Sequence, residues 1–159
     1  KKNKFIMKKY SLDKKKIEKI QKNRDPYLMI DYASEVIPGI SAKGYKDLKN
    51  DEWFFKVHWE GDPNMPGMLQ LESIVQMSAL ALLILPGNEG KVVYITTCSN
   101  IKFVKKVLPN CRFMVETFIR SFKRGMATCE GYAYVNKELV CSAKFNLVVP
   151  HLIEKYKIK

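Results

Sequence analysis

The sequence predicts an α+β fold in which an antiparallel sheet wraps around one long central helix. Residues 67–85 form a largely apolar stretch whose side chains would cover nearly every face of a helix, which indicates burial all round. Four segments with strand-like patterns follow, separated by turn-type residues. One buried helix followed by consecutive antiparallel strands is best covered by a sheet that curls around it.

The segment before the long helix should supply a short helix and two strands. Ser11 is an N-cap type of residue, and apolar positions at 12, 17 and 20 give residues 11–22 one weak apolar stripe. Two strands are expected between Tyr27 and Leu48, with a turn at Pro38-Gly39. Trp53-Phe54-Phe55 then leads into a Gly/Pro-rich loop.

The long helix and the later strands have clear boundaries in the sequence. Pro66 suits the first turn of the helix, and Pro86-Gly87-Asn88 ends it. The strands are expected at residues 91–104, 112–122, 126–135 and 139–149. The turns between them are Leu108-Pro109-Asn110, Lys123-Arg124-Gly125 and Asn136-Lys137.

The length and composition fit one soluble domain. A chain of 159 residues can bury a real core. No stretch reaches the roughly 18 uninterrupted apolar residues of a membrane span, so no membrane insertion is expected. The N-terminal residues lack the apolar run and cleavage site of a signal peptide, which predicts a cytoplasmic protein.

The cysteines and histidines do not indicate a metal site. Cys98, Cys111, Cys129 and Cys141 include no Cys-x-x-Cys pair, and their apolar, strand-like contexts favour buried free thiols over disulfides. His58 and His151 lie far apart without clustered ligands. We therefore predict neither a metal nor a cofactor.

Most of the net charge of +12 belongs to the N-terminal segment, since residues 1–24 hold eleven basic and two acidic residues. We divide the chain into a basic arm at 1–22, a folded domain at 23–150 and a tail at 151–159. No nucleic-acid partner is expected, because no nucleic-acid-binding motif follows the arm and few aromatic residues interleave its lysines. A solvated lysine surface is the simplest interpretation, and an acidic carrier protein or a membrane surface is the alternative.

The residues with catalytic potential gather between positions 57 and 72, in the run Val-His-Trp-Glu-Gly-Asp-Pro-Asn-Met-Pro-Gly-Met-Leu-Gln-Leu-Glu. His58 lies in the Gly/Pro-rich loop, and Glu72 is a lone carboxylate at the start of the apolar helix. A charge buried there is costly unless it is paired or neutral, so the protonation state of Glu72 should matter. Taken singly, the two would be a satisfied loop histidine and an acid favoured by the helix dipole. Their joint spacing favours acid/base chemistry.

The pattern His, two residues, Gly-Asp-Pro, one residue, Met-Pro-Gly, four residues, Glu resembles the active-site signature of the β-hydroxyacyl-acyl-carrier-protein dehydratases of fatty acid synthesis, which include the FabZ- and FabA-like enzymes. The likeness covers roughly residues 23–149. Gly-Asp-Pro is closer to the branch that also isomerises the double bond, whereas Glu72 in place of aspartate favours the simple dehydratase.

The departures from the family pattern fall around the expected pocket. Val57 replaces a usual Gly, Trp59-Glu60 replaces Phe-Pro, and Asn23 and Asp25 replace the His and Tyr of the family's opening motif. They therefore bear on the identity of the substrate more than on the class of reaction.

The resemblance implies the hot-dog fold, dimerisation through the sheet as a homodimer or a trimer of dimers, and an acyl carrier protein as partner. The reaction would convert a (3R)-hydroxyacyl carrier-protein thioester to the trans-2-enoyl thioester, with His58 as the base at Cα and Glu72 as the acid for the leaving hydroxyl. In this family the histidine of one subunit faces the acid of its partner.

The remaining site residues are assigned around this pair. The backbone N–H of Gly67, together with that of Met68, would bind the thioester oxygen at the helix N-terminus. Gln76, one turn after Glu72, would orient its carboxyl or serve only as a buried structural hydrogen-bonding group. Phe103 and Leu71 are assigned to the substrate tunnel.

Two other functions stay open at this point. A hot-dog thioesterase would use a carboxylate to activate water, but it would leave His58 without a task. A noncatalytic acyl-binding subunit would have kept the fold without the catalytic activity. The changes at Val57 and Glu60 are compatible with that function.

Overall fold

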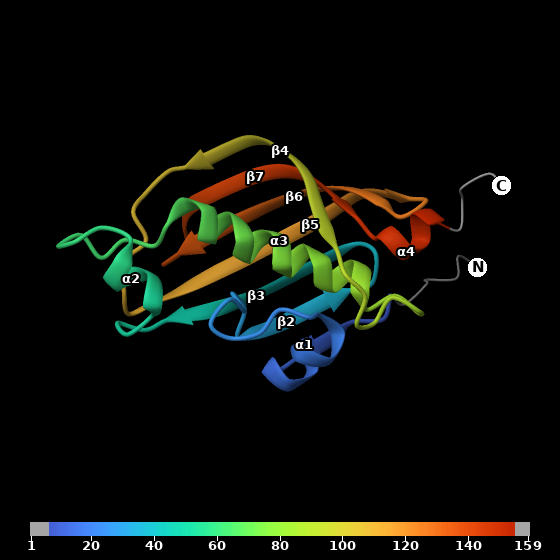
Figure 1. Ribbon diagram of the computed structural model, residues 1–159, viewed down its shortest axis with the longest axis horizontal. Coiled ribbons are helices and arrows are strands. Elements are labelled where there is room, and N and C mark those ends of the chain that lie inside the picture. The colour runs from blue at the N-terminus through green and yellow to red at the C-terminus, as the bar shows by residue number, and fades with distance from the viewer. Residues whose placement is uncertain (1–6, 155–159) are drawn as a thin grey trace, which may run out of the picture.

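The computed structural model describes residues 7–154 and has one antiparallel sheet curved around a central helix (Figure 1). The seven strands follow the order β1-β2-β3-β5-β6-β7-β4. Their bounds are β1 Tyr10–Leu12, β2 Tyr32–Ile37, β3 Ser41–Leu48, β4 Tyr94–Phe103, β5 Cys111–Lys123, β6 Met126–Val135 and β7 Glu138–Val148. The helices are α1 Lys14–Ile20, α2 Trp53–Val57, α3 Gly67–Leu83 and α4 Pro150–Ile153.

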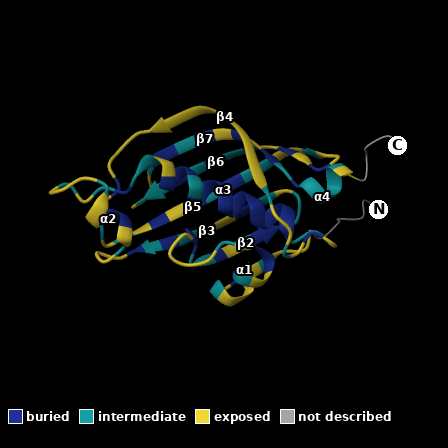
Figure 2. Ribbon diagram, viewed as in Figure 1, coloured by how far each residue is buried: buried dark blue, intermediate teal, exposed yellow. Residues whose placement is uncertain are grey.

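Helix α3 is the centre of the core, and fourteen of its seventeen residues are buried (Figure 2). It packs against the sheet so closely that a Cβ on Gly131 of β6 would lie 2.2 Å from Cγ2 of Ile74. Beyond its last turn, the side-chain amide of Asn88 donates a hydrogen bond of 2.9 Å to the carbonyl of Leu82. The predicted α+β architecture with one enclosed helix is confirmed.

The strands after α3 lie where the sequence predicts them, and the turn at Pro38-Gly39 joins β2 to β3 as expected. The short helix α2 was not predicted. It is only five residues long and lacks a side-chain cap, and its Phe54 and Phe55 are buried in the core. Tertiary packing rather than local propensity therefore explains this helix.

The N-terminal segment differs from the predicted arm in two respects. Ser11 is not a helix cap but lies in β1, which pairs with β2. The cap of α1 is Asp13, whose carboxylate accepts a hydrogen bond of 2.9 Å from the backbone N–H of Lys16. Because Ile17 and Ile20 are buried in the common core, residues 10–20 pack with the folded domain.

Strand β4 forms one edge of the sheet and is exposed along its whole length (Figure 2). The expectation of buried thiols is accordingly wrong for Cys98 in this strand, and Cys111 is only partly buried. Cys129 and Cys141 are buried, and burial raises the pKa of both thiols to about 12. Within residues 7–154, no helix has the length and apolar content needed to span a membrane.

Candidate active site

His58 directly follows α2, where it caps the helix C-terminus through a backbone hydrogen bond of 3.0 Å from its N–H to the carbonyl of Phe54. Its Nδ1 lies 2.8 Å from the carbonyl oxygen of Asn64. Because a carbonyl only accepts hydrogen bonds, Nδ1 carries the hydrogen in this contact. The neutral ring then has its lone pair at Nε2, which is the arrangement a general base needs.

The loop after His58 is tied to the segment that follows β4. The N–H of Met65 donates to the carbonyl of Val107 at 2.8 Å, and the N–H of Val107 donates to Oδ1 of Asn64 at 3.3 Å. Asn64 therefore positions His58 through its carbonyl and the loop through its side chain. Sequence analysis missed this residue, because its role depends on how the loop folds.

The N-terminus of α3 lies in the same pocket as His58. Gly67 and Met68 line this pocket of about 440 Å³ together with Phe103. The first N–H groups of a helix have no intrahelical acceptor and lie at the positive end of the helix dipole. Among the described residues, neither the N–H of Gly67 nor that of Met68 has an acceptor. They are available to a developing oxyanion.

Gly67 also allows a close approach to Phe103. A Cβ at position 67 would lie 2.9 Å from two ring atoms of Phe103, so the ring would have to shift for any larger residue. Phe103 is itself 50% exposed at the end of β4.

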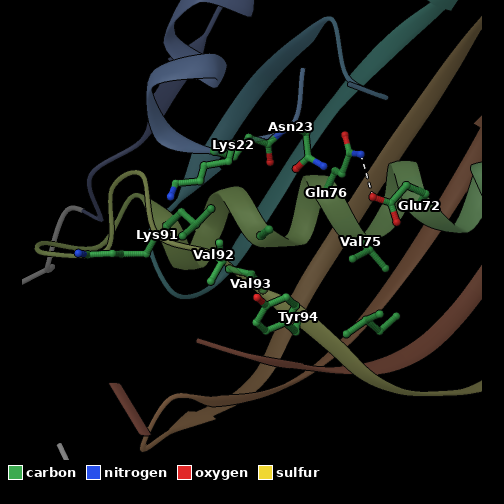
Figure 3. A pocket seen from close by; sticks show the side chains of 13 residues that line it. Lys22, Asn23, Glu72, Val75, Gln76, Lys91, Val92, Val93 and Tyr94 are labelled. Atoms are coloured by element: carbon green, nitrogen blue, oxygen red, sulfur yellow. Dashed lines mark hydrogen bonds between the residues drawn. The ribbon is translucent and has the colours of Figure 1, made fainter. Parts of the chain in front are cut away.

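Glu72 lies on α3 with its carboxyl beside Gln76 (Figure 3). Gln76 donates from Nε2 to Oε1 of Glu72 at 2.9 Å and to the carbonyl of Tyr27 at 2.9 Å. Its Oε1 accepts a hydrogen bond of 2.8 Å from the N–H of Met29. The two backbone partners fix the orientation of the amide, so that an N–H faces Glu72. The hydrogen bonds of Gln76 are thus compatible with either of the two roles given as alternatives, orienting the carboxyl of Glu72 or a purely structural role.

The surroundings of Glu72 favour the protonated acid. Burial raises the pKa of its carboxyl, and the hydrogen bond from Gln76 offsets part of this effect. No acidic or basic side chain pairs with Glu72 among the described residues. A carboxyl with a raised pKa keeps its proton to a higher pH than a free carboxyl does, and it can deliver that proton.

The structure places the predicted residues in two separate pockets of one chain. His58, Gly67, Met68 and Phe103 line the first, whereas Glu72 and Gln76 line the second. Leu71 lines neither of them and is buried in the core. Within residues 7–154, no group of three His, Cys, Asp or Glu side chains could hold a metal ion.

The family model of the FabA-like domain matches residues 22–144. The chain belongs to the FabA-like family. It is 37% identical over 137 residues to the 3-hydroxyacyl-[acyl-carrier-protein] dehydratase FabZ of Alkaliphilus metalliredigens, an overlap of 85% of this chain and 93% of that protein. The FabZ of Bacillus subtilis is 33% identical, with 87% of this chain and 98% of the relative covered.

Solved structures confirm the hot-dog fold predicted from this family. The dehydratase heterocomplex ApeI:P of Xenorhabdus doucetiae superimposes with a TM-score of 0.72, covering 89% of this chain and 97% of that chain at 9% identity. At such low identity, the superposition shows the fold alone. The membership in the FabA-like family confirms the resemblance that the signature around His58 and Glu72 indicates.

Proposed function

We propose that this FabA-like protein is a lyase that dehydrates a (3R)-hydroxyacyl carrier-protein thioester to the trans-2-enoyl thioester in fatty acid or related acyl-chain biosynthesis. The observation that carries the proposal is a histidine with its Nδ1 hydrogen committed to a carbonyl, combined with a buried carboxyl of raised pKa. One group is prepared to accept a proton and the other to give one. The curated FabZ relatives in the same family support this reaction.

The reaction follows from these two groups. Nε2 of His58 takes the proton from Cα, and the electrons of that C–H bond form the new double bond to Cβ. The C–O bond at Cβ breaks as Glu72 protonates the departing hydroxyl, which leaves as water. The N–H groups of Gly67 and Met68 stabilise the negative charge that develops on the thioester oxygen. Transfer of the proton from His58 back to Glu72 restores the starting state.

The complete site is proposed to combine two subunits, with His58 of one chain facing Glu72 of the partner subunit. Two observations support this arrangement. His58 and Glu72 line different pockets within one chain. The edge strand β4 is exposed and carries Ile95, Ile101 and Phe103. An exposed apolar edge strand calls for a partner, and a second copy of β4 would extend the sheet.

An acyl carrier protein is the proposed carrier of the substrate. Lys105 and Lys106 line the pocket of His58, and the lysines of α1 add to the positive charge of the surface. Such charge would attract an acidic carrier protein and raise its association rate. The four cysteines are free thiols, which is typical of a reducing compartment, and we place the reaction in the cytoplasm.

The test is to incubate the protein with a crotonyl thioester and to follow two signals together. Hydration, the reverse of the proposed reaction, removes the absorbance of the conjugated enoyl group without releasing thiol. Release of free thiol would instead indicate a thioesterase. Binding of the thioester with neither change would indicate a noncatalytic acyl-binding subunit.

A further inference from the structure

The pocket beside Glu72 contains a buried side-chain amide, that of Gln21. Gln21 lines this pocket and is 2% exposed, and neither Nε2 nor Oε1 has a hydrogen-bond partner among the described residues. Buried amides are nearly always hydrogen-bonded, because leaving them unpaired is costly. A ligand group that enters the pocket could supply the missing partner.

Several hydrogen bonds to the backbone hold the segment around Gln21 in place. Arg24 donates three hydrogen bonds of 2.8 Å to the backbone carbonyls of Glu18, Gln21 and Asn23. The carbonyl of Ile20 accepts a hydrogen bond of 2.8 Å from the N–H of Gly90, which joins this loop to the segment that begins at Lys91. The backbone that carries Gln21 is therefore held in place at the pocket wall.

The pocket has a different character at its two ends. Glu72 lies at one end, and Lys22 and Lys91 lie at the other (Figure 3). Apolar side chains line the wall between them: Val75, Ala79, Leu83, Val92 and Val93. The residues from Glu72 to Leu83 span roughly 16 Å of helix. Neither lysine has an acidic partner among the residues that the structure describes.

We propose that the acyl chain of the substrate ends in a carboxylate, which binds at the end of the pocket formed by Gln21, Lys22 and Lys91. This inference rests on the proposed function, in which the reacting carbons lie at Glu72. The chain would run along the apolar wall, and its far end would meet the amide and the two ammonium groups. A methyl end would leave the Gln21 amide without a partner, whereas a carboxylate would accept a hydrogen bond from its Nε2 and would be attracted by the two lysines.

The test compares pairs of 3-hydroxyacyl thioesters that have the same main-chain length but end in a methyl group or in a carboxylate. We expect the wild-type protein to prefer the carboxylate-terminated member by about tenfold or more in kcat/KM. Gln21→Leu and the double variant Lys22→Met/Lys91→Met should each remove most of this preference. Both should still process the methyl-terminated substrate. Lys19→Met is the matched control, since this lysine lies on α1 outside the pocket.

Two results would overturn the inference while leaving the dehydratase function intact. One is equal kcat/KM for the two members of each pair; the other is a preference that Gln21→Leu leaves unchanged. If neither member is turned over, the proposed function fails. Calorimetry with unreactive thioether analogues then measures binding affinity and tests the inference independently of turnover. Tighter binding of the carboxylate analogue that Gln21→Leu abolishes supports it, and equal affinities for both analogues refute it.

Discussion

The ring of His58 has one nitrogen committed to the backbone, because Nδ1 donates to the carbonyl of Asn64. The spacing of His58 and Glu72 in the sequence identifies the two residues but not this contact, since the carbonyl reaches the ring only through the fold of residues 59–64. Prediction from the sequence is limited in the same way for Gln76. Its place one turn after Glu72 could be predicted, but its hydrogen bonds to Tyr27 and Met29 could not.

The first prediction concerns the base. His58→Ala should lower kcat by about 10²–10⁴ while the protein stays folded, because a positioned general base contributes rate enhancement of that size. The measurement is hydration of crotonyl thioester, with circular dichroism to verify the fold. His151→Ala is the control, since that ring bonds Asn88 and lines neither pocket of the proposed site. If His58→Ala kept more than about a tenth of the activity, another group would be the base.

The second prediction concerns the acid and its pH dependence. Glu72→Gln should lose activity and gain stability near neutral pH, because it removes a carboxyl whose pKa is raised by burial. A carboxyl with a raised pKa in the folded state binds its proton more tightly there than when unfolded. The free energy of unfolding of the wild-type protein therefore falls as the pH rises above about 4.3, the pKa of this carboxyl in the unfolded chain.

The stability gain of Glu72→Gln should accordingly shrink as the pH falls through about 4.3 and be smallest well below it, where both folded and unfolded wild-type chains carry the proton. Urea unfolding of both proteins at neutral and acidic pH measures this difference. A gain of the same size at both values of pH would show that the charge of Glu72 is not its cause.

At the scale of helices and strands, the sequence predicts the structure best where burial follows a simple pattern. Helix α3 is apolar on nearly every face and ends two residues before the predicted Leu85, and β6 has the predicted bounds of Met126–Val135. The prediction fails where tertiary contacts determine the local structure or the exposure of a residue. Pairing with β2 draws Ser11 into a strand. Cys98 is exposed because it lies in the edge strand β4, which pairs on one side only, with β7.

The third prediction tests the proposed dimer through β4. Ile101 is 37% exposed on this edge strand, so the substitution Ile101→Glu should leave the subunit folded while placing a charge in the interface. We expect a native dimer to dissociate to monomers, as measured by mass photometry or light scattering. Ile40→Glu is the control, because Ile40 is similarly exposed at the turn between β2 and β3. If both variants kept the oligomeric state of the wild-type protein, the interface would lie elsewhere.

At the scale of the whole molecule, the residues of the proposed mechanism are distributed over two pockets. The proposed base and the N–H groups proposed to bind the oxyanion belong to one pocket, and the proposed acid belongs to the other. Each pocket lacks what the other provides. The proposed two-fold pairing would therefore create two complete sites in each dimer, built by exchange between the subunits.

The last prediction follows from this exchange. Refolding a mixture of His58→Ala and Glu72→Ala subunits should restore activity from two inactive proteins. In a mixed dimer, one site carries both substitutions, and the other site combines an intact His58 with an intact Glu72. Random pairing of equal amounts makes about half of the dimers mixed, so about a quarter of the wild-type sites should reappear. Mass spectrometry of the intact dimers verifies the exchange. Mixed dimers that stay as inactive as the separate variants would show that each chain builds its own site, because every site would then carry one substitution.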